Sequence, residues 1–265
     1  MARTDTLGNF LTDIADAIRE KNGTTDTIYA ASFDEEIKNL PTGGGDEELA
    51  TSYLSSIDDT LGQNTTKLPN GITSIGDYAF YGRSNLALTS LPNSITSIGD
   101  YAFDSCGNLA LTSLPSNLLK IGQRAFSYCS NLAVTNLPDT LITLSDYAFQ
   151  SCFKLKITSI PAGVIEIPSY CFRYCNSLTE ITMHGNITVI NNYAFQSCNT
   201  LAKIVFPNVT GVPTLSNVNA FNYTPIETGT GYIYVPDSLV DSFKSATNWS
   251  TYADQIKPLS ELEEE

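Results

Sequence analysis

Residues 86–108 read LALTSLPNSITSIGDYAFDSCGN, and this stretch contains the whole pattern on which the fold depends. The apolar run at 86–91 predicts one extended piece, and a turn separates it from a second extended piece at 95–98. Gly99 then permits a tight bend into 100–103, which reads as a short helical or 3₁₀ turn. One such unit exposes too much apolar surface to fold alone, so the pattern predicts a stack of similar units.

The same pattern returns every 23 residues through most of the chain. One column of equivalent positions holds phenylalanine, at Phe80, Phe103, Phe126, Phe149, Phe172 and Phe195. A second column holds cysteine in all but its first place, at Cys106, Cys129, Cys152, Cys175 and Cys198. A third column holds tyrosine, interrupted only by Arg124. A fixed period predicts a solenoid, and 23 residues lies within the range of about 20–29 that is typical of leucine-rich repeats.

The consensus of these columns, apolar-x-x-I-G-x-x-A-F-x-x-C-x-x-L, resembles the bacterial surface leucine-rich repeats of the BspA type. The hexapeptide IGDYAF occurs twice, and the resemblance covers residues 68 to about 210. It implies a leucine-rich-repeat solenoid of six 23-residue repeats at 68–210, each with a β-strand and a short helical turn. Ile181 and Ile204 replace a column of threonines in the last repeats, so we expect the inward register and the twist to change near residue 178.

All six cysteines are predicted to be reduced and structural. Five share one repeat position, where leucine-rich repeats place a buried Asn or Cys that faces the backbone turn. Cys171 occupies the position that is alanine in the other repeats and fills a small buried space. A column of cysteines spaced by 23 residues does not form a tetrahedral zinc site, so no metal or other cofactor is predicted.

The sequence offers little to support catalysis. Its single histidine, His184, takes the place of a proline at a turn, where a surface role is the simpler interpretation. The sequence contains no second histidine that could act as the general base of a Cys–His or a Ser–His–Asp arrangement. We therefore expect no catalytic residue and predict that the chain is not an enzyme.

Charge is distributed unevenly along the chain, whose formal net charge is −14. Residues 1–67 have a net charge of −8, residues 68–210 are neutral, and residues 211–265 have a net charge of −6. A neutral array argues against nucleic acid as a partner, because phosphate binding needs a basic patch. No stretch approaches the roughly 18 apolar residues of a membrane span, and residues 1–10 lack the apolar core of a signal peptide. We therefore expect cytoplasmic synthesis without membrane insertion.

The two ends differ from the repeats. Residues 1–45 predict a helical module that closes with a Gly-rich linker at 41–45, and residues 46–67 predict a helical cap of the solenoid or a self-pairing helix. Residues 211–265 predict a degenerate repeat followed by a C-terminal cap of mixed structure. The stretch LTDIADAIREKNGTTD at 11–26 is similar to the N-terminal module of phage and prophage structural proteins from Gram-positive hosts. The segment around Trp249 is similar to the closing segment of leucine-rich-repeat proteins in the same setting.

A candidate ligand surface lies beside the cysteine column of the middle repeats. Small or polar residues of the early repeats are replaced there by aromatic and basic residues, namely Tyr128, Phe153, Lys154, Lys156, Arg173 and Tyr174. Aromatic and cationic side chains on a neutral scaffold suit a carbohydrate or a protein partner. The alternative is that these side chains only fill space or aid solubility.

The phage resemblance implies a non-enzymatic, tail-associated virion protein. Residues 1–45 would then bind other virion or tail proteins, and the solenoid would bind a carbohydrate or protein of the host surface. A trimer would be typical of such attachment proteins. The alternatives are a bacterial cell-surface adhesin of the same repeat family and a capsid decoration or spacer protein.

Overall fold

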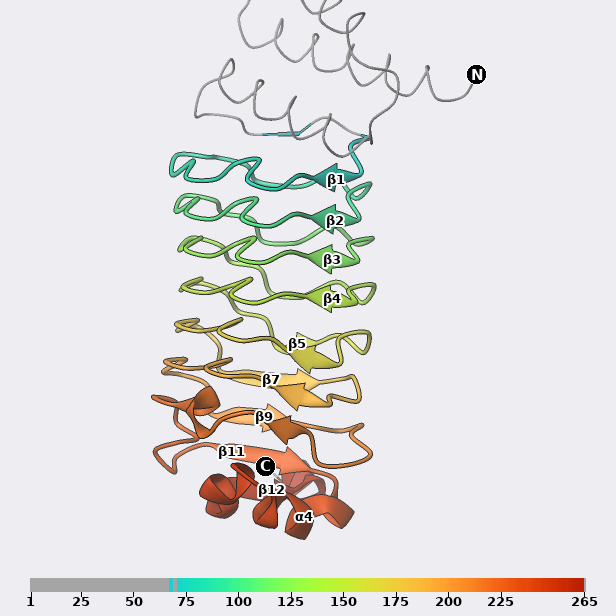
Figure 1. Cartoon of the computed structure of the whole chain (residues 1–265), viewed down its shortest axis with the longest axis vertical. Coiled ribbons are helices and arrows are strands. Elements are labelled where there is room, and N and C mark those ends of the chain that lie inside the picture. Colours follow the sequence, from blue (N-terminus) through green and yellow to red (C-terminus); the bar gives the residue numbers. More distant parts are fainter. Residues whose placement is uncertain (1–66, 69–70, 265) are drawn as a thin grey trace, which may run out of the picture.

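The computed structural model describes residues 67–68 and 71–264. The predicted modules and helices within residues 1–66 lie outside the described residues. The described chain winds into a column of flat turns, each of which we call a rung (Figure 1). We number the rungs after their phenylalanines, from rung 1 at Phe80 to rung 6 at Phe195.

Every paired strand in the described region is parallel to its neighbours, as stacked rungs require. A four-stranded sheet, in the order β1-β2-β3-β4, contains Ser74–Ile75, Ser97–Ile98, Lys120–Ile121 and Thr143–Leu144. A three-stranded sheet, in the order β10-β8-β6, contains Thr214–Leu215, Val189–Ile190 and Glu166–Ile167. A five-stranded sheet, in the order β12-β11-β9-β7-β5, contains Ile256–Pro258, Tyr232–Val235, Lys203–Val205, Glu180–Met183 and Ser159–Ile160. The predicted solenoid of short parallel strands is thus confirmed.

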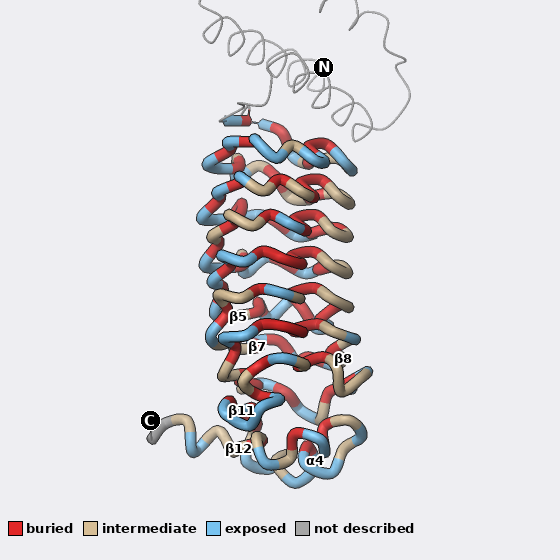
Figure 2. Tube along the Cα trace, turned by 90° about the vertical axis from the view of Figure 1, so that its left-hand side faces the viewer, coloured by how far each residue is buried: buried red, intermediate tan, exposed pale blue. Residues whose placement is uncertain are grey.

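Stacked aromatic rings run through the centre of the column. Phe80 and Phe103 have ring centroids 5.1 Å apart and nearly parallel planes, and each later phenylalanine stacks on the one before it. All of them are buried, and the inward side of every rung is buried along the whole stack (Figure 2). Because each rung shares its apolar core with its neighbours, the rungs stabilise one another and none is stable alone.

The predicted helical or 3₁₀ turn at 100–103 is wrong. Tyr101 has φ 57° and Ser105 has φ 65°, both in the left-handed region, so the segment is a succession of tight turns. Its backbone bonds point along the column, because the Phe103 N–H donates to the Ala125 carbonyl of the next rung at 2.8 Å. A helix would have used these N–H groups within one rung and left the stack without them.

Two hydrogen-bond ladders of opposite sense join successive rungs. On the strand side, a later rung donates to an earlier one, as when the Gly122 N–H bonds the Ile98 carbonyl at 2.8 Å. On the left-handed turn side, an earlier rung donates to a later one, as Phe103 does. Most rungs are therefore fastened to their neighbours along two separate lines.

The expected shift of inward register in the last repeats is confirmed by burial. Thr158 is exposed and Ile157 is buried, whereas Ile181 is buried and Glu180 is half-buried. Ile204 repeats the new pattern. The apolar residue has moved by one position, and this side of the column becomes a regular sheet from β5 onward. The change in twist stays a prediction.

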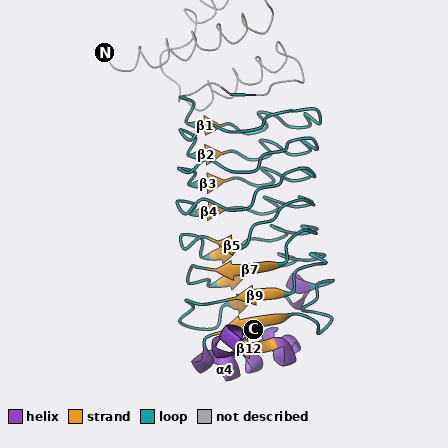
Figure 3. Ribbon diagram, turned by 180° about the vertical axis from the view of Figure 1, so that it is seen from behind, coloured by secondary structure: helices purple, strands orange, loops and turns teal. Residues whose placement is uncertain are grey.

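The C-terminal end is closed by a small helical cap (Figure 3). A degenerate rung comes first, with Phe221 of the 3₁₀ helix η1 stacked on Phe195 at 5.9 Å. The cap helices η1, η2, α4, η3 and η4 are Val218–Phe221, Asp237–Leu239, Val240–Ser245, Trp249–Gln255 and Leu259–Glu264. The Trp249 indole N–H donates to the Pro213 carbonyl at 2.7 Å, and its ring is buried against Phe243.

Candidate functional site

The turn side of the column carries two rows of left-handed residues. One row is the tyrosine column of the sequence, at Tyr78, Tyr101, Arg124, Tyr147, Tyr170 and Tyr193. The other row lies four residues further along each rung, at Gly82, Ser105, Tyr128, Ser151, Tyr174 and Ser197. Left-handed backbone is unusual for tyrosine, and the regular repetition of it shows that the stack imposes this conformation.

The first row forms a ladder of side chains on the outside of the column. Tyr147 and Tyr170 stack face to face with ring centroids 4.5 Å apart, and Tyr78 stacks on Tyr101 at 4.8 Å. Arg124 keeps the ladder continuous where the tyrosine is missing. Its guanidinium lies 4.6 Å from the Tyr147 ring centroid and 5.8 Å from that of Tyr101, so two cation–π contacts replace two stacking contacts.

Two of the predicted ligand-binding residues touch each other. The Arg173 guanidinium lies 4.6 Å from the Tyr174 ring centroid and donates to the Tyr174 hydroxyl at 3.2 Å. It also lies 5.5 Å from the Tyr170 ring centroid, which joins this pair to the tyrosine ladder. Three aromatic and cationic groups thus form one continuous surface across rung 5.

The other predicted residues lie on rungs 3 and 4. Tyr128, in the same row as Tyr174, is two rungs away from it, a distance of about 10 Å at ordinary strand spacing. Phe153 is exposed, and the neighbouring Lys154 donates from Nζ to Asn131 Oδ1 at 2.7 Å. Lys156 is exposed on the next side of the rung, where its N–H donates to the Val134 carbonyl. The six residues therefore span three rungs, and in the described structure Arg173 and Tyr174 are joined by a hydrogen bond and a cation–π contact.

A column of polar side chains lies beneath this surface. Asp104, Ser127, Gln150 and Gln196 are buried, and Arg173 continues the column half-buried. Burial raises the pKa of Asp104, while the hydrogen bond from Ser105 and the charge of Arg124 oppose that rise. Sequence reasoning missed this polar column, although its period of 23 residues was visible.

The cysteine column faces the backbone, as predicted. Each thiol donates to a phenylalanine carbonyl of the preceding rung, as Cys129 Sγ does to the Phe103 carbonyl at 3.0 Å. All six cysteines are free and buried. Burial raises the pKa of Cys198 to about 12 and raises that of Cys129 well above its ordinary value. Such thiols are poor nucleophiles, because the reactive thiolate is suppressed.

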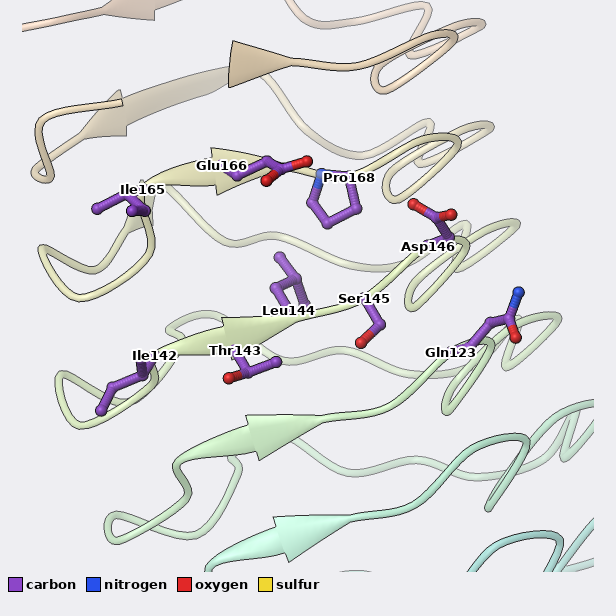
Figure 4. Close-up of a pocket in the computed structure, with 9 residues that line it drawn as sticks. All are labelled: Gln123, Ile142, Thr143, Leu144, Ser145, Asp146, Ile165, Glu166 and Pro168. Carbon is purple, nitrogen blue, oxygen red and sulfur yellow. The ribbon is translucent and has the colours of Figure 1, made fainter. Parts of the chain in front are cut away.

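A groove opens between β4 and β6, on the strand side of rungs 4 and 5 (Figure 4). It has a volume of about 530 Å³. Its lining residues are Gln123, Ile142, Thr143, Leu144, Ser145, Asp146, Ile165, Glu166 and Pro168. Ile142 and Ile165 lie at one end, and Asp146 lies at the other. This groove is not among the sites that the sequence predicts.

Pro168 removes one strand-side hydrogen bond at the groove. At the position of Pro168, Gly122 and Asn191 of other rungs donate their N–H groups to the carbonyls of Ile98 and Ile167. Proline has no N–H, so Leu144 receives no such bond. In the described structure β4 pairs with β3 and β6 pairs with β8, but β4 and β6 are not paired with each other. The one signal in the sequence was a proline in a column of glycine and small polar residues.

The remaining predictions concern His184, metal sites and membrane spans. His184 is exposed at its turn, and its N–H donates to the Ile160 carbonyl at 3.0 Å. Within the described residues, no cluster of His, Cys, Asp and Glu is arranged to hold a metal ion. Across 67–68 and 71–264, every helix is too short or too polar to span a bilayer.

The repeat pattern, the stacked core and the parallel strands define a bacterial-type leucine-rich-repeat solenoid. The chain belongs to the family described as the BspA type leucine rich repeat region, which matches residues 57–156 and 105–227. No curated protein matches the chain.

Two solved structures resemble the chain. A leucine rich cell surface protein from Faecalibacterium prausnitzii is 28% identical over 65% of this chain, with a TM-score of 0.52. A leucine rich repeat protein from T. pallidum is 29% identical over 69% of this chain and 83% of its own length, with a TM-score of 0.56. The chain matches 47% of the Faecalibacterium structure, or about half of it. Neither relative is described as a phage protein.

Proposed function

We propose that this chain is a non-enzymatic recognition protein of a bacterial cell surface. The observation that carries the proposal is the replacement of small residues by aromatic and basic ones across rungs 3 to 5, on a scaffold whose buried phenylalanine column does not vary. We call this set the aromatic-basic patch: Tyr128, Phe153, Lys154, Lys156, Arg173 and Tyr174. The related protein from Faecalibacterium prausnitzii, named as a cell surface protein, supports the placement.

The aromatic-basic patch suits a carbohydrate or protein of an opposing cell. Tyr128, Phe153 and Tyr174 expose large ring areas, which dominate the energetics of recognition surfaces. Arg173 is already held between two tyrosine rings, so little side-chain freedom would be lost on binding. Residues 68–210 are electrically neutral, which favours selective contacts over general attraction to polyanions.

The first experiment tests whether the protein is located on the cell surface. Antibody raised against residues 68–210 should label intact cells of the producing strain, and protease treatment of intact cells should remove the label. Labelling that appears only after cell lysis would contradict a surface function.

The second experiment tests the aromatic-basic patch. A triple alanine variant of Tyr128, Phe153 and Tyr174 should lose binding of the purified chain to target cells, with an unchanged far-UV circular dichroism spectrum. A matched control replaces Leu119 and Tyr223, which are exposed elsewhere on the column. Full binding by the triple variant, or equal loss by the control, would rule the patch out.

The resemblance at residues 11–26 favours a second placement of the same recognition protein, on a phage or prophage tail. There residues 1–45 would bind other tail proteins, and the molecule would act as a trimer. Immunogold electron microscopy of particles from the culture distinguishes the two placements. Gold on tail ends would favour the virion, gold on capsids would favour a decoration protein, and gold on cells with bare particles would favour the cell surface.

A further inference from the structure

The groove between β4 and β6 lies on the strand side of the column, apart from the aromatic-basic patch. Its opening comes from the backbone. On the preceding rungs, the Leu119 N–H donates to the Thr96 carbonyl at 2.8 Å, and the Ile142 N–H donates to the Leu119 carbonyl at 3.0 Å. Between the described rungs 4 and 5 the equivalent bond from Ile165 to Ile142 is missing, as is any bond from Pro168 to Leu144. The wall formed by β4 therefore presents carbonyl oxygens to the groove.

The charged side chains that line the groove are both acidic. Asp146 Oδ1 accepts the Ser169 N–H at 2.9 Å, and Glu166 Oε1 accepts from Asn191 Nδ2 at 2.6 Å. These bonds fix the orientation of both carboxylates, and each keeps a second oxygen for another donor. No Lys or Arg belongs to the lining, so the negative charge there is not neutralised from within the groove.

The other end of the groove is apolar. Ile142 is 61% exposed and Ile165 is 54% exposed, which is high for isoleucine on a folded protein. Figure 4 shows both isoleucines at the end of the groove away from Asp146. An aliphatic side chain would be buried between them, and the stem of a long cationic side chain would pack along Pro168.

We propose that this groove binds an extended peptide segment of a protein partner, with an apolar residue between the isoleucines and a Lys or Arg near Asp146 and Glu166. Charge complementarity selects the cation, and the carbonyls of the β4 wall add acceptors for its N–H groups. In an extended segment, residues two apart lie on the same side, about 7 Å from each other. The partner motif is therefore apolar-x-Arg/Lys. This site goes beyond the proposed function, because it operates wherever the chain is located.

The test uses the full chain and a fluorescein-labelled peptide, acetyl-Ser-Ile-Thr-Arg-Ser-amide, followed by fluorescence anisotropy. A matched peptide with Gln in place of Arg should bind at least about tenfold more weakly, which corresponds to one well-placed charged contact. Equal binding of the two peptides, or failure of the arginine peptide to bind at millimolar protein, would overturn the proposal.

Two protein variants locate the binding. The double variant Asp146→Asn and Glu166→Gln should weaken the arginine peptide by about tenfold or more. Asp100→Asn is the matched control, because Asp100 Oδ1 accepts the Gln123 N–H at 2.7 Å in the same column, where the strands are paired. Loss of binding in the control, or wild-type binding in the double variant, would show that the groove carboxylates are not the site.

A backbone variant tests the groove without removing either acid. Pro168→Asn supplies an N–H that can reach the Leu144 carbonyl, as Asn191 reaches the Ile167 carbonyl at 2.9 Å. We expect the strands to pair, the groove to close and the arginine peptide to bind about tenfold more weakly or worse. Wild-type affinity in this variant would contradict the proposal. Because the aromatic-basic patch is unaltered, binding to target cells should persist in all of these variants, which separates the two sites.

Discussion

At the residue scale, each repeated side chain has one task set by its position. The cysteines show this most clearly, since each thiol donates a second hydrogen bond to a buried phenylalanine carbonyl that also accepts a backbone N–H, as the Phe103 carbonyl accepts from Cys129 Sγ and from the Cys106 N–H. A carbonyl oxygen has two lone pairs, so the thiol satisfies the second one and contributes about 0.5–1.5 kcal/mol in each rung. Asparagine could do the same, but it would need more room and more partners of its own.

The buried thiols make stability fall at high pH. The Cys198 thiol ionises near 9.0 when unfolded and near 12 when folded, because burial disfavours the thiolate. The folded state therefore retains the proton over this window, and its stability is complete below pH 9 and decreases as the pH rises. Each such thiol contributes about 1.4 kcal/mol per pH unit. Urea unfolding at pH 8 and pH 10 should show the decrease, and Cys198→Ala should make it smaller. A stability that rises with pH would contradict this account.

Arg124 should be replaceable by the residue of its own column. Arg124→Tyr restores ring stacking between Tyr101 and Tyr147, so we expect little change in the free energy of unfolding. Arg124→Ala removes both cation–π contacts and should cost about 1–2 kcal/mol. Burial raises the pKa of Asp104, and the Arg124 charge favours its ionised form. The cost of Arg124→Ala should therefore decrease as the pH falls through the pKa of Asp104, because a protonated carboxyl no longer attracts the guanidinium. Equal costs for the two variants in urea unfolding would refute the ladder interpretation.

At the element scale, the spacing between strands depends on the residue that follows each one. A Cβ atom built on Gly122 would lie 2.6 Å from the Gly99 carbonyl carbon and 2.7 Å from the Asp100 nitrogen. Rungs 2 and 3 thus approach so closely that only glycine fits there. Pro168 occupies the same column in rung 5, where β6 is not paired with β4 and the groove opens. Ser145 and Asn191 also carry side chains in this column, but the strands that precede them, β4 and β8, remain paired with β3 and β6.

This contrast predicts different costs for two similar substitutions. Gly122→Ala should destabilise the protein by about 1–3 kcal/mol, because backbone atoms of the preceding rung must move. Gly107→Ala is the control, since its Cβ would meet only Ser130 Oγ at 3.7 Å, and it should change stability by less than about 0.5 kcal/mol. Thermal unfolding of the two variants would test the difference. Similar melting temperatures would mean that the strands can separate at little cost.

At the scale of the whole molecule, a solenoid is as stable as its ends allow. The last strand, β12, is covered by α4 and η3, and Trp249 packs between Phe221 and Phe243. Without this cap, the open edge of the five-stranded sheet would invite pairing with other chains. The cap therefore contributes to the stability of the column and protects the edge of its sheet.

Trp249 is the only tryptophan in the chain, so its fluorescence reports on the cap alone. Trp249→Ala should destabilise the protein by about 3–5 kcal/mol and promote aggregation. In the unaltered protein, the fluorescence red shift in urea should come before or together with loss of the circular dichroism signal. Circular dichroism lost first, with the tryptophan still buried, would show that unfolding begins elsewhere.

The sequence predicted the architecture because the 23-residue period can be recognised without knowing the conformation of any single rung. The phenylalanine and cysteine columns could be placed inside the stack without knowing any backbone angle. The left-handed tyrosines could not be predicted in this way, because stacking overrides the intrinsic preference of tyrosine. The groove was missed for a related reason. Pro168 looks like one more turn residue until the missing N–H is set against the carbonyl of Leu144 in the rung before it.

The missing strand pairing between rungs 4 and 5 also has a mechanical consequence. Under tension along the column, other neighbouring rungs are held by a strand ladder on one side and a turn ladder on the other. Between rungs 4 and 5 the turn ladder remains, with Tyr147 and Phe149 donating to the Ser169 and Cys171 carbonyls at 2.9 Å. A pulling force would therefore bend the column open at this level first. Stretching would spread Ile142 from Ile165 and widen the groove.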